Sequence, residues 1–144
     1  MNSEYLICGD YNGRITVWEI SERQAGGAAQ GSATIFPQLR HVIDNSRIEK
    51  GIGRENEGNE VLVLQFWMNE DTREGQILVG GNNKNIQVYS IRNATLEKEM
   101  SGHLDSVTCM AIDGSLLFTG SDDCTIRQWE LTLNTPSGLV GRHD

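Results

Sequence analysis

The chain has 144 residues, enough for one domain with a buried core, and its 16 glycines against 2 prolines favour turns and short strands over long helices. A net charge of −8 argues against nucleic acid or an anionic membrane surface as a partner, and no apolar run is long enough to span a membrane. The 3 cysteines fit neither a disulfide framework nor a zinc site, so we expect reduced thiols, an intracellular protein and no bound metal.

In chain order, runs of β-branched and apolar residues between turn residues predict a series of short strands. Residues 22–33 are small and polar and suit a loop, whereas 34–42 could form an outer strand in which Pro37 is tolerated at an exposed edge. We expect His41 to lie in a loop. The strands are predicted at 5–8, 14–19, 61–67, 77–80, 86–91, 107–112, 116–120 and 126–131.

Three stretches of the chain, 10–20, 81–91 and 121–131, share one outline. Aligned on an aromatic residue, each has glycine nine positions upstream, Asn or Asp six upstream and isoleucine three upstream. The glycine ends one strand, and the Asn or Asp forms a tight turn because its short side chain bonds nearby backbone. A second strand with alternating side chains follows. The aligned residues are Gly9, Asn12, Ile15 and Trp18, then Gly80, Asn83, Ile86 and Tyr89, then Gly120, Asp123, Ile126 and Trp129.

The spacing of these units points to an architecture. Tyr89 and Trp129 are 40 residues apart, and Trp18 precedes Tyr89 by 71, which is one such period plus an insert. A period of about 40–45 residues with four strands per unit is typical of β-propeller blades. Residues 101–131, SGHLDSVTCMAIDGSLLFTGSDDCTIRQWEL, closely resemble a WD repeat with Trp-Glu in place of Trp-Asp. The resemblance implies an all-β fold built from blades of four antiparallel strands.

The resemblance implies that the whole chain, 1–144, is a portion of a WD-repeat propeller. It divides into a blade part at 1–42, a loop insert at 43–60, a blade at 61–102 and a blade at 103–144. That is about two and a half blades, whereas a closed propeller has about four to eight. We therefore expect a fragment of a larger propeller, or a chain that is completed by further blades, a partner chain or self-association.

The resemblance also implies a hydrogen-bonded chain of side chains inside the last blade. The matching residues are His103, Asp123, Trp129 and a hydroxyl from Ser121 or Thr119. The histidine would lie between the carboxylate and the hydroxyl, and the indole would contribute one N–H donor. The two earlier blades have asparagine at the aspartate position, so we expect this chain to be weakened or absent there.

For function, the sequence carries none of the motifs of phosphate-binding loops, serine hydrolases or zinc proteases, so we expect no enzyme and no cofactor. The resemblance implies a non-catalytic scaffold for protein–protein interaction within a larger assembly. Two alternatives stay open: a structural propeller subunit of a ciliary or cytoskeletal assembly, and a substrate-recognition module attached to an enzyme outside this segment. The expected location is the cytoplasm or the cytoskeleton, with the nucleus left open.

In propellers of this family, partners usually bind the face formed by the turns just before the Asp or Asn. Such a face here would be acidic and would favour a basic peptide or protein surface. Tyr11 is the best single candidate because it is aromatic and stands in a turn. The partner-binding candidates are Tyr11, Asn82, Leu104, Asp105, Ser106 and Asp122.

Overall fold

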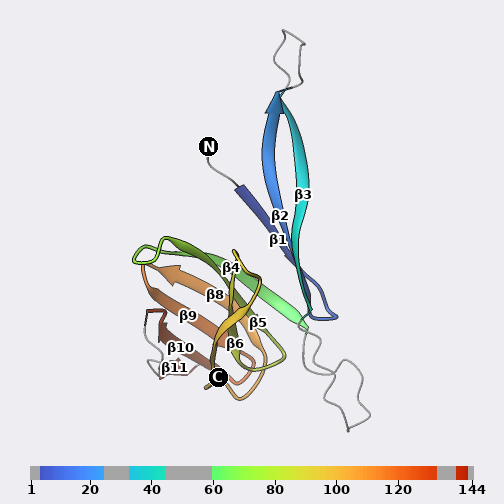
Figure 1. The fold of residues 1–144 in the computed structure, drawn as a ribbon. Helices are drawn as coiled ribbons and strands as arrows, with labels where there is room; N and C mark the ends of the chain where they lie inside the picture. The colour runs from blue at the N-terminus through green and yellow to red at the C-terminus, as the bar shows by residue number, and fades with distance from the viewer. Residues whose placement is uncertain (1–3, 25–32, 45–59, 133–138, 143–144) are drawn as a thin grey trace.

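Three antiparallel sheets make up the computed structural model, which describes residues 4–24, 33–44, 60–132 and 139–142 (Figure 1). Within these ranges the chain forms strands and turns, and no helix there could cross a membrane. The first sheet has three strands in the order β1-β2-β3. They are β1 (Glu4–Gly9), β2 (Arg14–Gln24) and β3 (Ala33–Asp44).

The second and third sheets have four strands each, in the orders β4-β5-β6-β7 and β11-β10-β9-β8. The second consists of β4 (Val61–Asn69), β5 (Glu74–Gly81), β6 (Ile86–Ser90) and β7 (Leu96–Met100). The third consists of β8 (Val107–Asp113), β9 (Leu116–Ser121), β10 (Thr125–Glu130) and β11 (Leu139–Arg142). These are antiparallel sheets of consecutive strands, as expected for propeller blades.

Each predicted strand overlaps an observed one, but the connections differ. β2 continues to Gln24 and β3 reaches Asp44, so both the loop predicted at 22–33 and the insert predicted at 43–60 start inside strands. The remainder of these two segments lies mostly outside the described residues. The loop position predicted for His41 is wrong, because His41 lies half-buried in β3, opposite Val17 of β2.

The three sheets pack side by side through equivalent strands. β4 contacts β8, β5 also contacts β8, and β1 contacts β4. β1 therefore corresponds to β5, which is the strand next to the innermost strand, β4, in the second sheet. Among the described residues, the first sheet has no strand on the inner side of β1.

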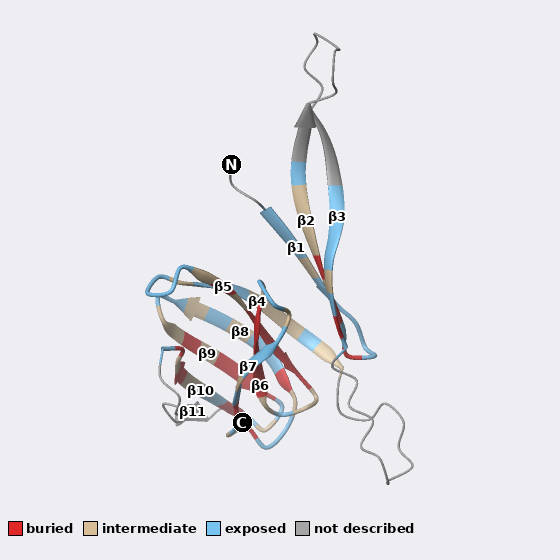
Figure 2. Ribbon diagram, in the orientation of Figure 1, coloured by how far each residue is buried: buried red, intermediate tan, exposed pale blue. Residues whose placement is uncertain are grey.

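Two apolar cores lie between the sheets, and the second sheet contributes to both (Figure 2). Successive side chains of a strand point to opposite faces, so Ile77 packs toward the first sheet and Leu78 toward the third. The core between the first and second sheets contains Ile15, Val17, Ile43, Ile77, Val79 and Tyr89. The core between the second and third contains Trp67, Leu78, Ile86, Val88, Met100, Val107, Leu117, Trp129 and Leu131.

The repeated glycine allows the sheets to approach closely. A Cβ at Gly80 would lie 2.7 Å from Met110 Cε and 2.9 Å from Val107 Cγ1, both in the third sheet. A Cβ at Gly9 would lie 2.4 Å from Val61 Cγ1 in the second sheet. A larger residue at either position would require these side chains, or the strand that carries them, to shift.

Candidate functional site

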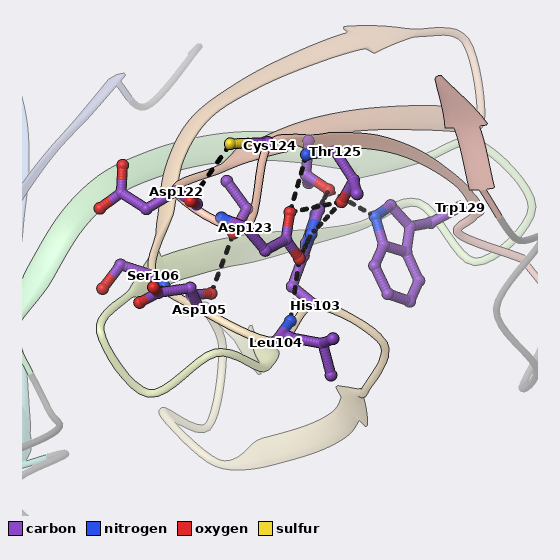
Figure 3. Close-up of polar contacts among 11 residues, drawn as sticks. His103, Leu104, Asp105, Ser106, Asp122, Asp123, Cys124, Thr125 and Trp129 are labelled. Atoms are coloured by element: carbon purple, nitrogen blue, oxygen red, sulfur yellow. Dashed lines mark hydrogen bonds and ion pairs between the residues drawn. The ribbon is translucent and has the colours of Figure 1, made fainter. Parts of the chain in front are cut away.

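A buried chain of hydrogen bonds joins the segment before β8 to the third sheet (Figure 3). His103 is 4% exposed, and its Nδ1 lies 2.8 Å from Asp123 Oδ2 in the turn between β9 and β10. Its Nε2 lies 2.7 Å from Thr119 Oγ1 on β9. Trp129 Nε1 on β10 donates to the same hydroxyl at 2.8 Å. Four residues that are separated in sequence thus form one polar cluster between the sheets.

The donors and acceptors of this chain can be assigned by elimination. The ionised carboxylate of Asp123 can only accept, so the ring proton of His103 sits on Nδ1 and is donated to it. In the neutral ring Nε2 is then an acceptor, so Thr119 Oγ1 donates to Nε2 and accepts from the indole N–H of Trp129, which can only donate. Each polar atom in the sequence of bonds has a partner, which is the condition for a buried network to stabilise a fold.

Asp123 receives more hydrogen bonds than the histidine alone provides. Burial raises the pKa of Asp123, but bonds from the Thr125 hydroxyl, the Leu104 backbone N–H and His103 outweigh it and hold the pKa far below its usual range. The backbone N–H groups of Leu104 and Thr125 lie 2.9 Å and 2.8 Å from its carboxylate oxygens. The carboxylate is therefore held ionised while it ties two segments together.

Ser121 and Thr119 were equivalent candidates for the hydroxyl position, and the structure separates them. Thr119 Oγ1 bonds His103 and Trp129, whereas Ser121 Oγ donates to the Asp105 carbonyl at 3.0 Å and accepts from the Asp123 N–H at 3.1 Å. Ser121 thus stabilises the turn between β9 and β10, next to the network. Its hydroxyl bonds backbone groups and not the histidine, so the three residue types of a hydrolase triad do not assemble here.

Thr125 is a member of the network that sequence reasoning missed. Its hydroxyl donates to Asp123 Oδ1, and its Oγ1 lies 3.1 Å from His103 Nδ1. The available signal was its place two residues after the turn aspartate, where an aspartate side chain commonly bonds the backbone of the chain that follows.

The first sheet has a different arrangement at the matching positions. Asn12 is exposed, and its N–H and that of Arg14 both donate to Asp10 Oδ1 at 2.9 Å, so Asp10 holds the turn. Trp18 Nε1 donates to Thr16 Oγ1 on the same strand at 3.1 Å. This turn is therefore stabilised locally, by bonds that span a few residues.

The six partner-binding candidates lie at one end of the sheets, where the β1–β2, β5–β6 and β9–β10 turns meet the chain entering β4 and β8 (Figure 1). We call this end the turn face. Two large apolar side chains there are strongly exposed, Tyr11 at 73% and Leu104 at 79%. Asp105 and Asp122 are exposed as well, and Asp122 lies on the far side of Asp105 from Leu104 (Figure 3).

The other two candidates are half-buried and take part in holding the backbone. Asn82 Oδ1 accepts from the Glu60 N–H at 2.7 Å, and its own N–H donates to the Glu60 carbonyl. The carbonyl of Ser106 accepts from the Asp122 N–H at 2.9 Å. In both blades the β-turn is thus fastened to the chain that enters the innermost strand.

Comparison with known proteins agrees with this geometry. The sheets define the protein as a set of β-propeller blades, and residues 94–130 match the family model "WD domain, G-beta repeat". Residues 94–130 are therefore similar to a WD40 repeat, and the chain shares the β-propeller blade fold of the solved structures described next.

Two solved structures share the fold over nearly the whole chain. "Structure of U3-55K" and "Crystal structure of RRP9 WD40 repeats" each align with a TM-score of 0.67, cover 97% of this chain and 36% of the other, and are 16% and 17% identical to it. CCR4-associated factor 4, from two strains of Saccharomyces cerevisiae, is 32% identical over 81 residues. The match covers 54% of this chain and 12% of that protein.

Proposed function

We propose that the chain is a non-catalytic protein-interaction scaffold within a larger assembly, and that its turn face binds a protein or peptide. The observation that carries this proposal is the exposure of Tyr11 and Leu104, at 73% and 79%, on segments whose backbone is held by hydrogen bonds to the carboxylates of Asp10 and Asp123. Large apolar side chains on a rigid, polar-rimmed surface are typical of interaction sites. The relative CCR4-associated factor 4 is named for association with another protein, which supports a role of this kind.

The charge of the turn face favours a basic partner. Asp10, Asp105 and Asp122 are exposed there, and the whole chain has a net charge of −8. Complementary charge steers association and excludes acidic competitors, while the apolar side chains supply the buried contact. We therefore propose a peptide or protein surface that places Lys or Arg beside an apolar anchor.

Hydrogen bonds that hold the backbone of the turn face before binding also support this proposal. The carboxylate of Asp123 accepts the N–H of Leu104, and the N–H of Asp122 donates to Ser106. These bonds fix the backbone on both sides of the exposed side chains before a partner arrives. Binding then requires little further ordering of the protein, which lowers its entropic cost.

Among the described residues, nothing covers two surfaces of the blades. β1 pairs only with β2, and the outer face of the third sheet exposes Ile126 at 40%. We propose that further blades, a partner chain or a second copy covers them in the assembled protein.

The free thiols support an intracellular site of action. Cys8, Cys109 and Cys124 are all exposed and unpaired in the structure, a state that persists in a reducing compartment. We propose the cytoplasm or the cytoskeleton, to be tested by imaging the tagged chain.

The turn face can be tested with two single variants and a matched control. Tyr11→Ala removes the aromatic anchor and Asp122→Lys reverses a charge on the turn face, whereas Asp113→Lys makes the same change on an exposed residue at the far end of β8. Partners captured by the wild type should be lost or reduced with the first two variants and kept with the third. Equal capture by all four proteins would remove the turn face from consideration.

A further inference from the structure

A hollow of about 480 Å³ opens between the first and second sheets, and it is lined by strands and turns distinct from those of the turn face. One wall is apolar and comes from Tyr5 of β1 and from Phe66 and Met68 of β4. These side chains are 42%, 42% and 47% exposed, although they stand at an interface between two sheets. The two sheets therefore leave apolar surface uncovered where they diverge.

The charged part of the lining has three arginines and two glutamates, in a chain that is acidic as a whole. Arg40 of β3, Arg73 of the β4–β5 turn and Arg92 after β6 all line the hollow. Arg40 Nε pairs with Glu19, and Arg92 Nη1 lies 3.5 Å from Glu74 Oε1. Because these two glutamates also line the hollow, its arginines and glutamates leave one formal positive charge.

Arg73 supplies that charge. No carboxylate among the described residues lies within ion-pair distance of its guanidinium, and the residue is exposed. Its backbone has a φ of 56°, in the left-handed region, where the turn from β4 into β5 closes. An arginine at this position presents a planar pair of donors beside an apolar wall, which is the arrangement that binds a carboxylate next to an apolar group.

We propose that this hollow, defined by Tyr5, Arg40, Phe66, Met68, Arg73 and Arg92, binds an acidic peptide segment. One carboxylate of the segment would bind Arg73, and a neighbouring leucine or phenylalanine would cover Phe66 and Met68. Among the described residues, Arg40 and Arg92 each form one ion pair with a glutamate, and their other N–H groups would donate to a second acidic side chain. The site is distinct from the turn face and opposite to it in charge, so the two would take different partners.

The test uses a fluorescein-labelled acidic peptide, Glu-Asp-Leu-Phe-Asp-Glu, and the version with every carboxylate replaced by its amide. Fluorescence anisotropy with the full chain should show saturable binding of the acidic peptide, weakened by salt, and at least about tenfold weaker binding of the amide version. Arg73→Glu should weaken binding about tenfold or more, since it reverses the one unbalanced charge. Met68→Glu should weaken it as well, because it puts a carboxylate on the apolar wall.

Arg14→Glu is the matched control, since Arg14 is an exposed arginine at the start of β2, next to the turn face. It should leave the affinity within about twofold of the wild type, since it lies outside the hollow. Arg73→Asn guards against misfolding because asparagine tolerates positive φ, and it should also weaken binding. The proposal is overturned if the wild type does not bind, if the amide peptide binds equally well, or if Arg14→Glu weakens binding as much as Arg73→Glu. Loss of turn-face binding in the earlier test would leave this result unaffected.

Discussion

Ile86 and Ile126 occupy equivalent positions in adjacent blades, but Ile86 is completely buried and Ile126 is 40% exposed. Ile86 packs in the core shared with the third sheet, and Ile15, the third member of the set, packs in the core shared with the second. The repeated isoleucine thus lies on the face that the next blade covers. No described residue covers this face at Ile126.

Truncation of these two isoleucines should have very different effects on stability. Ile86→Ala should lower the free energy of unfolding by about 2–5 kcal/mol, because it opens a cavity in a filled core. Ile126→Ala should lower it by less than about 1 kcal/mol, because water already reaches that side chain. Urea denaturation of both variants measures the difference, and equal losses would show that a neighbour covers both positions.

The repeated glycine offers a second matched pair. Gly80→Ala should destabilise the protein by about 1–3 kcal/mol, because the new methyl group would meet Val107 and Met110 of the adjacent blade. At Gly120 a Cβ would meet only Cys109 Sγ, at 2.5 Å, and that side chain is exposed and can rotate away. Thermal melting should therefore show a larger loss for Gly80→Ala. The reverse order would contradict the close-packing explanation.

The hydroxyl at the centre of the buried network should be necessary for stability. Thr119→Val keeps the shape of the side chain but leaves Trp129 Nε1 and His103 Nε2 without a shared partner, at a cost of about 1–3 kcal/mol. Thr108→Val, on an exposed position of β8, is the control and should be nearly neutral. Chemical denaturation distinguishes the two variants. A neutral Thr119→Val would mean that water or another group replaces the hydroxyl.

Acid should weaken the fold through Asp123. Its pKa in the folded chain is lowered, so its ionised form contributes stability above the ordinary carboxyl pKa of about 4, and that contribution is lost as pH falls below this value. Asp123→Asn should be less stable than the wild type at pH 7, with a smaller further loss between about pH 5 and pH 2. Asp113→Asn, at an exposed site, should follow the wild-type profile. Parallel profiles for wild type and Asp123→Asn would contradict the role assigned to this carboxylate.

The sequence predicts the inner strands of these blades much better than the outer ones. Most of the aligned isoleucines and aromatic residues are buried in one of the two cores, so they show in the pattern of apolar residues. β7, with the sequence LEKEM, is an outer strand whose exposed positions accept charged residues, so the pattern of apolar residues does not predict it. The outer strand expected at 34–42 is present as β3, and it includes His41, which we expected in a loop.

Within the network, the sequence could predict the residue types but not the choice of hydroxyl. Thr119 and Ser121 are two residues apart on one strand, so they point to the same face and a period of two cannot separate them. Their positions along β9 distinguish them. Trp129 lies opposite Leu117, so its indole reaches the hydroxyl of Thr119, which is nearer to Leu117 than Ser121 is. The hollow beside Arg73 depends on the angle between two sheets, which no local pattern encodes.

The second sheet is covered on both faces, and this has a consequence for amide hydrogen exchange. The N–H groups of β5 and β6 lie between two apolar cores, and Trp67 Nε1 further ties this sheet to the Gly114 carbonyl of the third at 2.8 Å. These amides can meet solvent only when both neighbouring sheets have moved away, so they should exchange most slowly. β1, whose inner edge pairs with no described strand, should exchange first. We therefore expect the first sheet to open first and the second sheet to be the last to exchange its amide protons.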